Sequence, residues 1–256
     1  MSSSVQRKRI RKSPEARRAE IVDAAAAVAL AEGLECLTLR RIAEELAVRP
    51  GLISHYFPSV EDLVAEAFGT AAGAELEVLL PLGADGAPGV AGSLGADGPL
   101  GVAGSPGVVG TPGVAGPPGA DGDVSTPTGR LARFFARTSG EAYDAISRLW
   151  INARHLSRYR PLLRERVAEQ EAAWRGRLEE VIREGVERGE FRTEDPYVTA
   201  IQILVVLDGL GAHANTEDRG RPEAVTRMAV TIAERELGLP LGALTGALAR
   251  DATGDA

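Results

Sequence analysis

Residues 38–57, with the sequence TLRRIAEELAVRPGLISHYF, contain two short amphipathic helical patterns separated by a tight turn. The first pattern follows Thr38, a favourable N-cap, and repeats apolar residues on one helical face: Leu39, Ile42, Ala43 and Leu46. The second begins at Pro50, which suits a first helical turn, and its inward face comprises Ile53, Tyr56 and Phe57. The pair indicates a helix-turn-helix whose second helix can enter the major groove of DNA. Short helical pairs are also common packing units, so the pattern alone leaves both interpretations open.

Helical periodicity continues on both sides of this pair. Ser59 and Asp62 resemble a capping box that starts the next helix. Further helices are predicted at residues 14–31, 60–80, 126–138, 141–157, 161–188, 196–213 and 222–238. The sequence therefore predicts an all-α protein. Its predicted parts are a basic disordered arm (1–13), a helix-turn-helix domain with a connecting helix (14–80), a carboxy-terminal helical domain (126–239) and a flexible tail (240–256).

One segment interrupts the helical pattern. Between Gly83 and Gly122 a glycine stands at every third position, which is a collagen-like composition. Six prolines in these triplets would make a triple helix weak, and such a helix needs three chains. The alternative is a disordered loop. Lengthening a short loop to this size costs the folded state only about 2 kcal/mol in closure entropy, so the flanking domain can tolerate it. We interpret residues 83–124 as a passive insert.

Charge is distributed unevenly along the chain. The net charge is −7, yet residues 1–18 carry seven basic side chains against one acidic side chain. Such an arm suggests contact with a polyanion, although a solvated tail has the same composition. The single cysteine, Cys36, excludes a disulfide framework, and its apolar neighbourhood predicts a small buried filler.

Several classes of protein are disfavoured by the sequence. The charged start argues against a signal peptide, and the longest apolar stretch is shorter than a membrane span. A cytoplasmic location is therefore expected. No phosphate loop, metal-ligand cluster or nucleophile elbow is present, so neither an enzyme nor a cofactor is expected.

The residues around the helical pair also resemble a known family. Residues 18–68 include EIVDAA (20–25), EGLECLTLRRIAEELAV (32–48) and RPGLISHYFPSVEDLVAEAF (49–68), and together they resemble the DNA-binding domain of TetR-family regulators. Within that family, GLISHYF is similar to the branch typified by BetI, a choline-responsive repressor. Residues 184–210, EGVERGEFRTEDPYVTAIQILVVLDGL, resemble the carboxy-terminal part of the same regulators. The resemblance implies a homodimeric repressor that a small-molecule effector releases from its operator DNA.

The inward face of the second short helix leaves a polar face for DNA. On or beside that face lie Arg49, Gly51, Leu52, Ser54 and His55, which can reach bases or phosphates. The resemblance adds a phosphate contact from the Tyr56 hydroxyl and backbone contacts from Thr38 and Arg40. His55 as a solvated side chain and Tyr56 as pure packing remain alternatives. In this chain Arg49 replaces the family's usual serine, and Val60 replaces a common lysine. These two departures leave the operator sequence open but not the DNA binding.

The carboxy-terminal half is expected to hold the dimer interface and the effector. A two-fold interface is expected on the helices at 196–213 and 222–238, through Ile201, Leu204, Val205, Met228 and Ile232. Effector-pocket candidates are Phe134, Tyr143, Trp150, Tyr159, Trp174 and Asp208. The rings could enclose a quaternary ammonium group such as that of choline, or could simply be core. Asp208 interrupts an apolar helix and is expected to have a partner. Two rival interpretations remain, a collagen-like assembly protein and a DNA-binding dimer without an effector.

Overall fold

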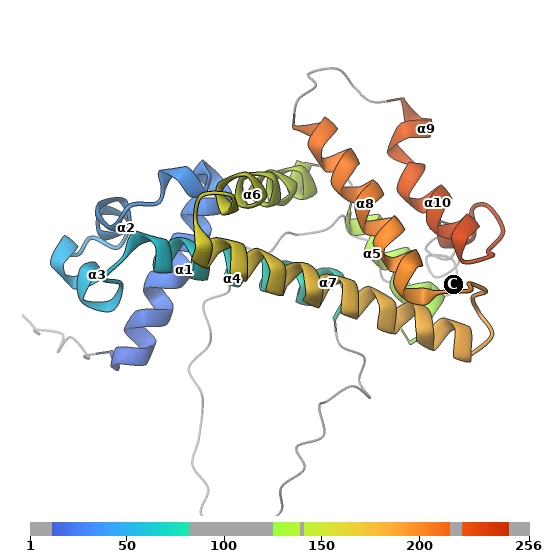
Figure 1. Cartoon of the computed structure of the whole chain (residues 1–256), viewed down its shortest axis with the longest axis horizontal. Helices are drawn as coiled ribbons and strands as arrows, with labels where there is room; N and C mark the ends of the chain where they lie inside the picture. Colours follow the sequence, from blue (N-terminus) through green and yellow to red (C-terminus); the bar gives the residue numbers. More distant parts are fainter. Residues whose placement is uncertain (1–11, 82–124, 139–140, 216–221, 246–256) are drawn as a thin grey trace, which may run out of the picture.

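The computed structural model describes residues 12–81, 125–138, 141–215 and 222–245, and all of its regular elements are helices (Figure 1). This confirms the predicted all-α class. The first half contains α1 (Pro14–Glu32), a short 3₁₀ helix η1 (Leu34–Cys36), α2 (Leu39–Glu45), α3 (Pro50–Tyr56) and α4 (Val60–Leu79). The second half contains α5 (Pro127–Arg137), α6 (Glu141–Ser157), α7 (Pro161–Glu187), α8 (Pro196–Ala214), α9 (Glu223–Thr226) and α10 (Met228–Glu236). The basic residues 1–11 lie outside the described part of the chain.

The amino-terminal helices form a small unit around one buried centre. Ile21 of α1, Ile42 of α2 and Ile53 of α3 are fully buried in it. The hydroxyl of Thr38 accepts a hydrogen bond from the Arg41 amide at 3.0 Å, so the predicted N-cap of α2 is confirmed. Ser59 caps α4 through the Glu61 amide at 3.0 Å, without the return bond from Asp62 that a capping box would have.

Helix α4 connects this unit to the carboxy-terminal half. It packs against α1 at one end and along α7, the 27-residue helix that spans the carboxy-terminal half. Arg18 of α1 donates to Glu66 of α4 at 2.6 Å, and its guanidinium lies 4.7 Å from the centre of the Phe57 ring. These contacts tie the orientation of α1 and of the end of α3 to α4, so a displacement of α4 would move the amino-terminal unit.

Two sequence predictions about the end of the chain are wrong. The single helix predicted at 222–238 is divided at Arg227 into α9 and α10. Part of the predicted flexible tail is packed, because the Glu234 carboxylate accepts the amides of Gly242 and Leu244 at 2.9 Å and Leu244 is buried. The buried carboxylate supplies acceptors that the apolar periodicity could not reveal. Residues 246–256 lie outside the described residues.

The two segments that flank residues 82–124 are each held by hydrogen bonds to the described part of the chain. Arg177 of α7 donates to the Leu80 carbonyl at 2.5 Å, and Arg137 of α5 donates to the Val78 carbonyl at 3.1 Å. On the other side, the Thr126 hydroxyl caps α5 through the Gly129 amide at 3.0 Å. Contacts within the described residues therefore hold both flanking segments.

We accordingly expect the insert to be dispensable for folding. Replacing residues 83–124 by a linker of about ten glycine and serine residues should raise the free energy of unfolding by about 1 kcal/mol, because a shorter loop costs less closure entropy. Urea denaturation of the full chain and of the shortened chain measures this difference. Loss of cooperative unfolding in the shortened chain would show that the insert contributes to the fold.

A close contact in α7 gives a second test of the packing. A Cβ atom at Gly185 would lie 2.0 Å from Cδ2 of the buried Phe191 ring, whereas a Cβ at Gly176 in the same helix meets nothing within 4 Å. Gly185→Ala should therefore lower the free energy of unfolding by about 2 kcal/mol through overpacking. Gly176→Ala should raise it by about 0.5–1 kcal/mol through helix propensity. Equal effects in urea denaturation would contradict this packing.

Candidate DNA interface and effector pocket

Helix α3 presents the side chains that the sequence predicted for DNA contact. Ile53 and Phe57 are buried in the core and α3 packs against α2, so the opposite side of α3 is turned outward. The outward residues are Arg49, Gly51, Ser54 and His55, with Leu52 half-buried beside them. Arg49 occupies the N-cap position of α3 and makes no capping hydrogen bond with its side chain. Its guanidinium is thus not used by the helix.

Tyr56, Thr38 and Arg40 have partial roles within the fold. Tyr56 is half-buried and packs on the core, with its ring edge-on to His55 at 5.2 Å between ring centres. Arg40 pairs with Glu44 at 2.9 Å, but the Arg40 side chain is 83% exposed. Such an exposed ion pair is weak, so another anion can take the place of Glu44. The Thr38 hydroxyl serves as the α2 cap, and Thr38 as a whole is exposed at the start of that helix.

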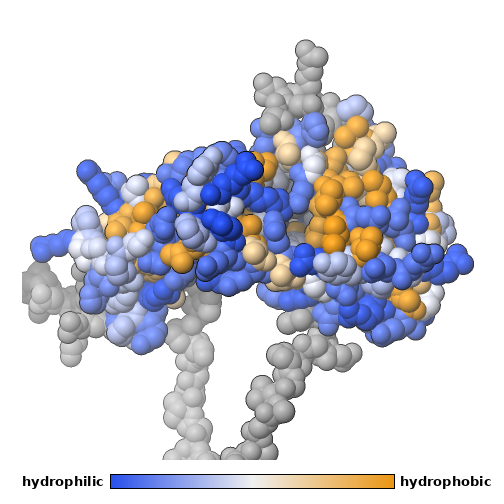
Figure 2. Space-filling model, in the orientation of Figure 1, coloured by the Kyte–Doolittle hydropathy of each residue, from blue (hydrophilic) through white to orange (hydrophobic). Residues whose placement is uncertain are grey.

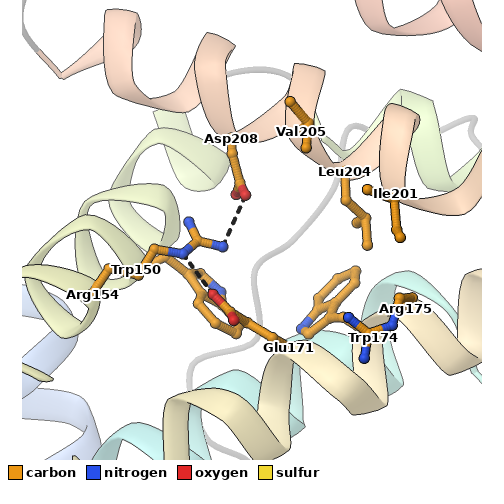
Figure 3. A pocket seen from close by; sticks show the side chains of 9 residues that line it. All are labelled: Trp150, Arg154, Glu171, Trp174, Arg175, Ile201, Leu204, Val205 and Asp208. Atoms are coloured by element: carbon orange, nitrogen blue, oxygen red, sulfur yellow. Dashed lines mark hydrogen bonds and ion pairs between the residues drawn. The ribbon is translucent and has the colours of Figure 1, made fainter. Parts of the chain in front are cut away.

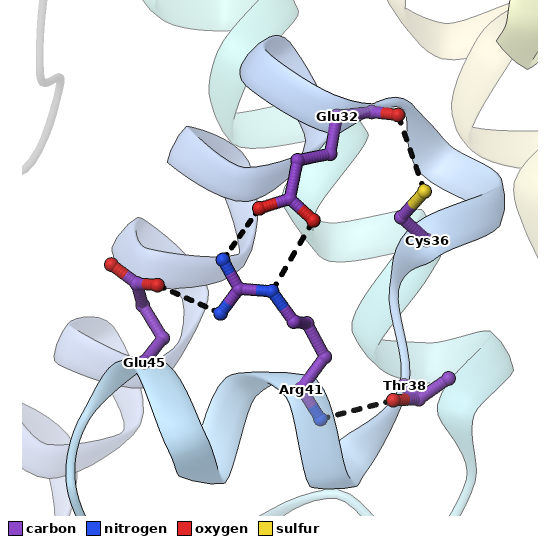
Figure 4. A network of polar contacts seen from close by, with 5 residues as sticks. All are labelled: Glu32, Cys36, Thr38, Arg41 and Glu45. Atoms are coloured by element: carbon purple, nitrogen blue, oxygen red, sulfur yellow. Dashed lines mark hydrogen bonds and ion pairs between the residues drawn. The ribbon is translucent and has the colours of Figure 1, made fainter.

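A polar network beneath α2 fixes the helix-turn-helix to α1 (Figure 4). Arg41 donates to Glu32, at the end of α1, at 2.5 and 3.2 Å, and to Glu45 at 2.7 Å. The bidentate pair holds the pKa of the Glu32 carboxyl below its ordinary value, through the Arg41 hydrogen bonds. Cys36 is exposed and its thiol donates to the Glu32 carbonyl at 3.2 Å. The prediction of a buried Cys36 is therefore wrong, because η1 places Leu34 rather than Cys36 in the core.

A second feature is a hollow of about 190 Å³ between α6, α7 and α8, here named the three-helix pocket (Figure 3). Its walls are Trp150, Arg154, Glu171, Trp174, Arg175, Ile201, Leu204, Val205 and Asp208. Three of the predicted effector residues, Trp150, Trp174 and Asp208, are brought together in it. The hollow is smaller than a drug-sized pocket of about 300–1,000 Å³, which restricts it to small ligands.

Arg154 organises the charges of the three-helix pocket. It donates from Nε to Glu171 at 2.8 Å and pairs through Nη2 with Asp208 at 2.8 Å (Figure 3). Its guanidinium also lies 5.1 Å from the centre of the Trp150 ring. Burial raises the pKa of Asp208, and the Arg154 charge opposes that rise. The predicted partner of Asp208 is thus confirmed, and it links α6 to both α7 and α8.

A carboxyl group that the sequence did not single out lies next to this pocket. Glu75 of α4 accepts a hydrogen bond from Trp150 Nε1 at 2.9 Å. Burial, with a smaller contribution from the negative charge of Asp208, raises the pKa of Glu75 to about 8, although the Trp150 hydrogen bond lowers it. Tyr143 lies near Glu75 and Asp208, and burial raises the pKa of its hydroxyl as well. Only the fold brings α4 and α6 together here, so no sequence pattern indicated Glu75.

The remaining predicted pocket residues do not line the three-helix pocket. Phe134 is fully buried and packs on Phe135 and Trp174, with ring centres 5.0 and 6.4 Å away. Tyr143 is half-buried and packs against the core. Tyr159 is 74% exposed beyond the end of α6 and contacts His155, so its assignment to a pocket is wrong. Its position in the turn before α7 faces it outward.

Apolar side chains gather on the exposed part of α8, and three of them, Ile201, Leu204 and Val205, also line the three-helix pocket (Figure 2). Val205 is 61% exposed and Val198 44% exposed, while Ile201 and Leu204 are half-buried. Of the two candidates on α10, Met228 is exposed and Ile232 half-buried. Helix α8 is the one helix in the described residues that is long and apolar enough to cross a membrane, and it is only partly covered in the monomer. Within residues 12–81, 125–138, 141–215 and 222–245 no group of three or more metal-ligating side chains is found.

Comparison with known proteins agrees with this arrangement. Residues 21–67 match the model of bacterial regulatory proteins of the tetR family, and residues 131–238 match the carboxy-terminal domain of BetI-type transcriptional repressors. Residues 81–127 match the collagen triple helix repeat. No curated protein sequence matches the chain.

Solved structures with the same fold cover most of the chain. A protein from Rhodococcus sp. assigned to the TetR family superposes with a TM-score of 0.61 at 19% identity, covering 86% of this chain and 98% of its own. A TetR transcription regulator from Haloarcula marismortui gives 0.59 at 16% identity, covering 87% and 96%. A transcriptional regulator from Saccharomonospora viridis in complex with choline gives 0.57 at 19% identity, covering 85% and 94%. With a TetR-type amino-terminal domain followed by a BetI-type carboxy-terminal domain, the chain belongs to the TetR family of DNA-binding transcriptional regulators.

Proposed function

We propose that the protein is a homodimeric repressor that binds its operator through α3 and is released when a small organic cation binds in the three-helix pocket. The observation that carries the DNA-binding part is the two-sided character of α3. Ile53 and Phe57 anchor one side in the core, and the other side exposes Arg49, Ser54 and His55. A rigid helix with an exposed polar face is what insertion into the major groove requires.

Each proposed DNA contact follows from the chemistry of its side chain. Ser54 and His55 read base edges by hydrogen bonds, Leu52 contacts a thymine methyl group, and Gly51 lets the backbone approach closely. Arg49 binds phosphate, as does the hydroxyl of Tyr56. At the start of α2, Thr38 and Arg40 bind the sugar-phosphate backbone, with phosphate taking the place of Glu44 beside Arg40. Residues 1–11 would add further positive charge.

The proposed dimer interface is the outer side of α8 together with α10. Exposed Val205, Val198 and Met228 leave an apolar surface that a second copy would remove from water. A membrane is the poorer occupant, because Asp208 lies in the same helix and is paired with Arg154. DNA half-sites are read in symmetric pairs, so a two-fold interface positions two α3 helices at once. A cytoplasmic location goes with this proposal.

The aromatic lining of the three-helix pocket favours a cation. Glu171 and Asp208 both pair with Arg154, and the second guanidinium of the lining, that of Arg175, lies 5.4 Å from the centre of the Tyr197 ring. The indole rings of Trp150 and Trp174 are suited to cation–π attraction. Since the Arg154 guanidinium already lies over the Trp150 ring, a ligand cation would have to displace it. That displacement would separate α6 from α8 and so favour a second arrangement of the domains.

Selection of genomic fragments by the purified protein, followed by titration with choline, tests this function. We expect a fragment retained over random competitor, an affinity that falls steeply with salt, and release by choline but not by equal concentrations of sodium chloride. Retention without release would leave a DNA-binding dimer with a different effector or none. The absence of any preferred fragment would contradict the repressor itself.

A further inference from the structure

Glu75 differs from the other carboxylates around the three-helix pocket. Glu171 and Asp208 each pair with Arg154, whereas Glu75 has no ion pair in the part of the chain that the structure describes. Its one hydrogen bond comes from the Trp150 indole at 2.9 Å. An unpaired carboxyl group in such a place is most stable as the neutral acid, and burial raises its pKa to about 8.

Trp150 connects this carboxyl group to the pocket. The indole forms part of the pocket wall, donates its N–H to Glu75, and contacts Phe68 edge-on at 5.0 Å between ring centres. Glu75 and Phe68 are seven residues apart on α4 and therefore lie on one face of that helix. A pocket residue thus contacts α4 at two points, and α4 in turn packs on α1 of the DNA-binding unit.

Two titratable groups interact with Glu75 directly, Tyr143 of α6 and Asp208 of α8. Around them lie Asp144 and Arg154 of α6, which act on Tyr143, and Glu171 of α7, which pairs with Arg154. Asp208 opposes ionisation of Glu75, and Arg154 is occupied by Asp208 and Glu171. A ligand cation would add one positive charge on the pocket side of the Trp150 indole, because the displaced Arg154 guanidinium stays attached to α6. That charge would act on Glu75 across one indole ring, in surroundings where charges interact more strongly than in water.

We propose that Glu75 is part of the effector site. A cationic effector converts its carboxyl group to a carboxylate, and the proton passes to solvent. The ionised form then weakens operator binding through Trp150 and α4. This inference rests on the proposed function. It assigns Trp150 as a binding residue that contacts the effector and Glu75 as a positioning residue that acts through Trp150.

The direction of the pH effect follows from the proton balance. The operator-bound form holds Glu75 protonated, and the released form holds it ionised, so DNA binding is linked to uptake of a proton. Raising the pH through 8 should therefore imitate the effector and weaken operator binding. By the same linkage, a cation that expels the proton should bind more tightly as the pH rises toward 8.

The test uses the full chain in two independent measurements. The first is the fluorescence of the Trp174→Phe variant, in which Trp150 is the remaining tryptophan. We expect its emission to change between pH 7 and 9, and the change to be absent when Glu75→Gln is added, because glutamine does not ionise. A change that persists with Glu75→Gln, or no change in either variant, would overturn the inference whether or not the protein binds DNA.

The second measurement is operator affinity against pH, for a fragment retained by the wild-type chain. The dissociation constant of the dimer should rise roughly 100-fold from pH 6.5 to 9 in the wild type, for two linked protons, one in each copy, over about one pK unit each. It should change less than twofold in Glu75→Gln, while Glu169→Gln, an exposed change on α7, should behave like the wild type. Equal pH dependence in all three would overturn the coupling to DNA. Failure to find any retained fragment would instead count against the proposed function, and the fluorescence result would still decide the role of Glu75.

Discussion

Ser54→Glu is expected to abolish specific DNA binding while leaving the fold intact. Ser54 is exposed on α3, and its hydroxyl makes only long bonds of 3.4 Å to the Pro50 and Gly51 carbonyls, so the fold loses little. A carboxylate at this position would face phosphates and base acceptors. Like charges brought together at an interface cost several kcal/mol, which corresponds to a loss of at least about 100-fold in affinity. Titration of a retained fragment at fixed salt measures the loss.

The matched control places the same charge elsewhere. Ala172→Glu adds one carboxylate on an exposed position of α7, far along the chain from α3. Its effect on affinity should stay within a few fold, because distant surface charges are screened by salt. If both variants bound DNA as the wild type does, α3 would not be the reading helix.

Val205→Glu is expected to convert the dimer into monomers. Val205 is the most exposed apolar residue of α8, and a second copy would bury it twice in a symmetric interface. Burying two unpaired carboxylates would raise the dimer dissociation constant by at least about 100-fold. Sedimentation equilibrium over a range of protein concentrations measures the change. Operator affinity should fall with it, because one α3 helix reads only half a site.

Leu241 offers the control for the dimer. It is 77% exposed, more than Val205, but it lies after α10 and outside the proposed interface. Leu241→Glu should leave the molecular mass unchanged. A wild-type chain that sediments as a single copy, or equal masses for the two variants, would contradict the α8 interface.

The helices and the outward face of α3 could be predicted from the sequence because both follow from local periodicity. Thr38, Pro50 and the apolar residues of the short helices carry their own start signals and spacing, so one face had to be buried and the other exposed. Asp208 was expected to have a partner because a charge in an apolar helix needs one. Its partner Arg154 lies 54 positions earlier in the chain, and only the packing of α6 against α8 brings the two together.

The errors have the same origin. Tyr159 was assigned to the pocket because aromatic residues cluster in that part of the sequence, but the turn before α7 directs it to solvent. Cys36 was expected to be buried because its neighbours are apolar, yet η1 rotates Leu34 inward instead. Glu75 was missed because a single acidic residue on the predicted connecting helix has no special signal until Trp150 of α6 packs against it. Local patterns specify helices, whereas the pocket depends on contacts between distant segments.

The connection between pocket and DNA runs through α4. The same helix holds Glu66, which pairs with Arg18 of α1, and Glu75, which accepts from the pocket residue Trp150. Its carboxy-terminal end is held by Arg177 and Arg137 where residues 82–124 begin. A shift of α4 caused at the pocket would therefore act on the DNA-binding end.

Footprinting of the purified protein on a retained DNA fragment tests the central claim most directly. Two copies of α3 related by a two-fold axis predict two protected half-sites in inverted orientation, with centres about one helical turn, roughly 34 Å, or a multiple of it apart. Protection of a single site without symmetry, or protection that does not depend on the sequence of the fragment, would contradict a dimer that reads DNA through α3.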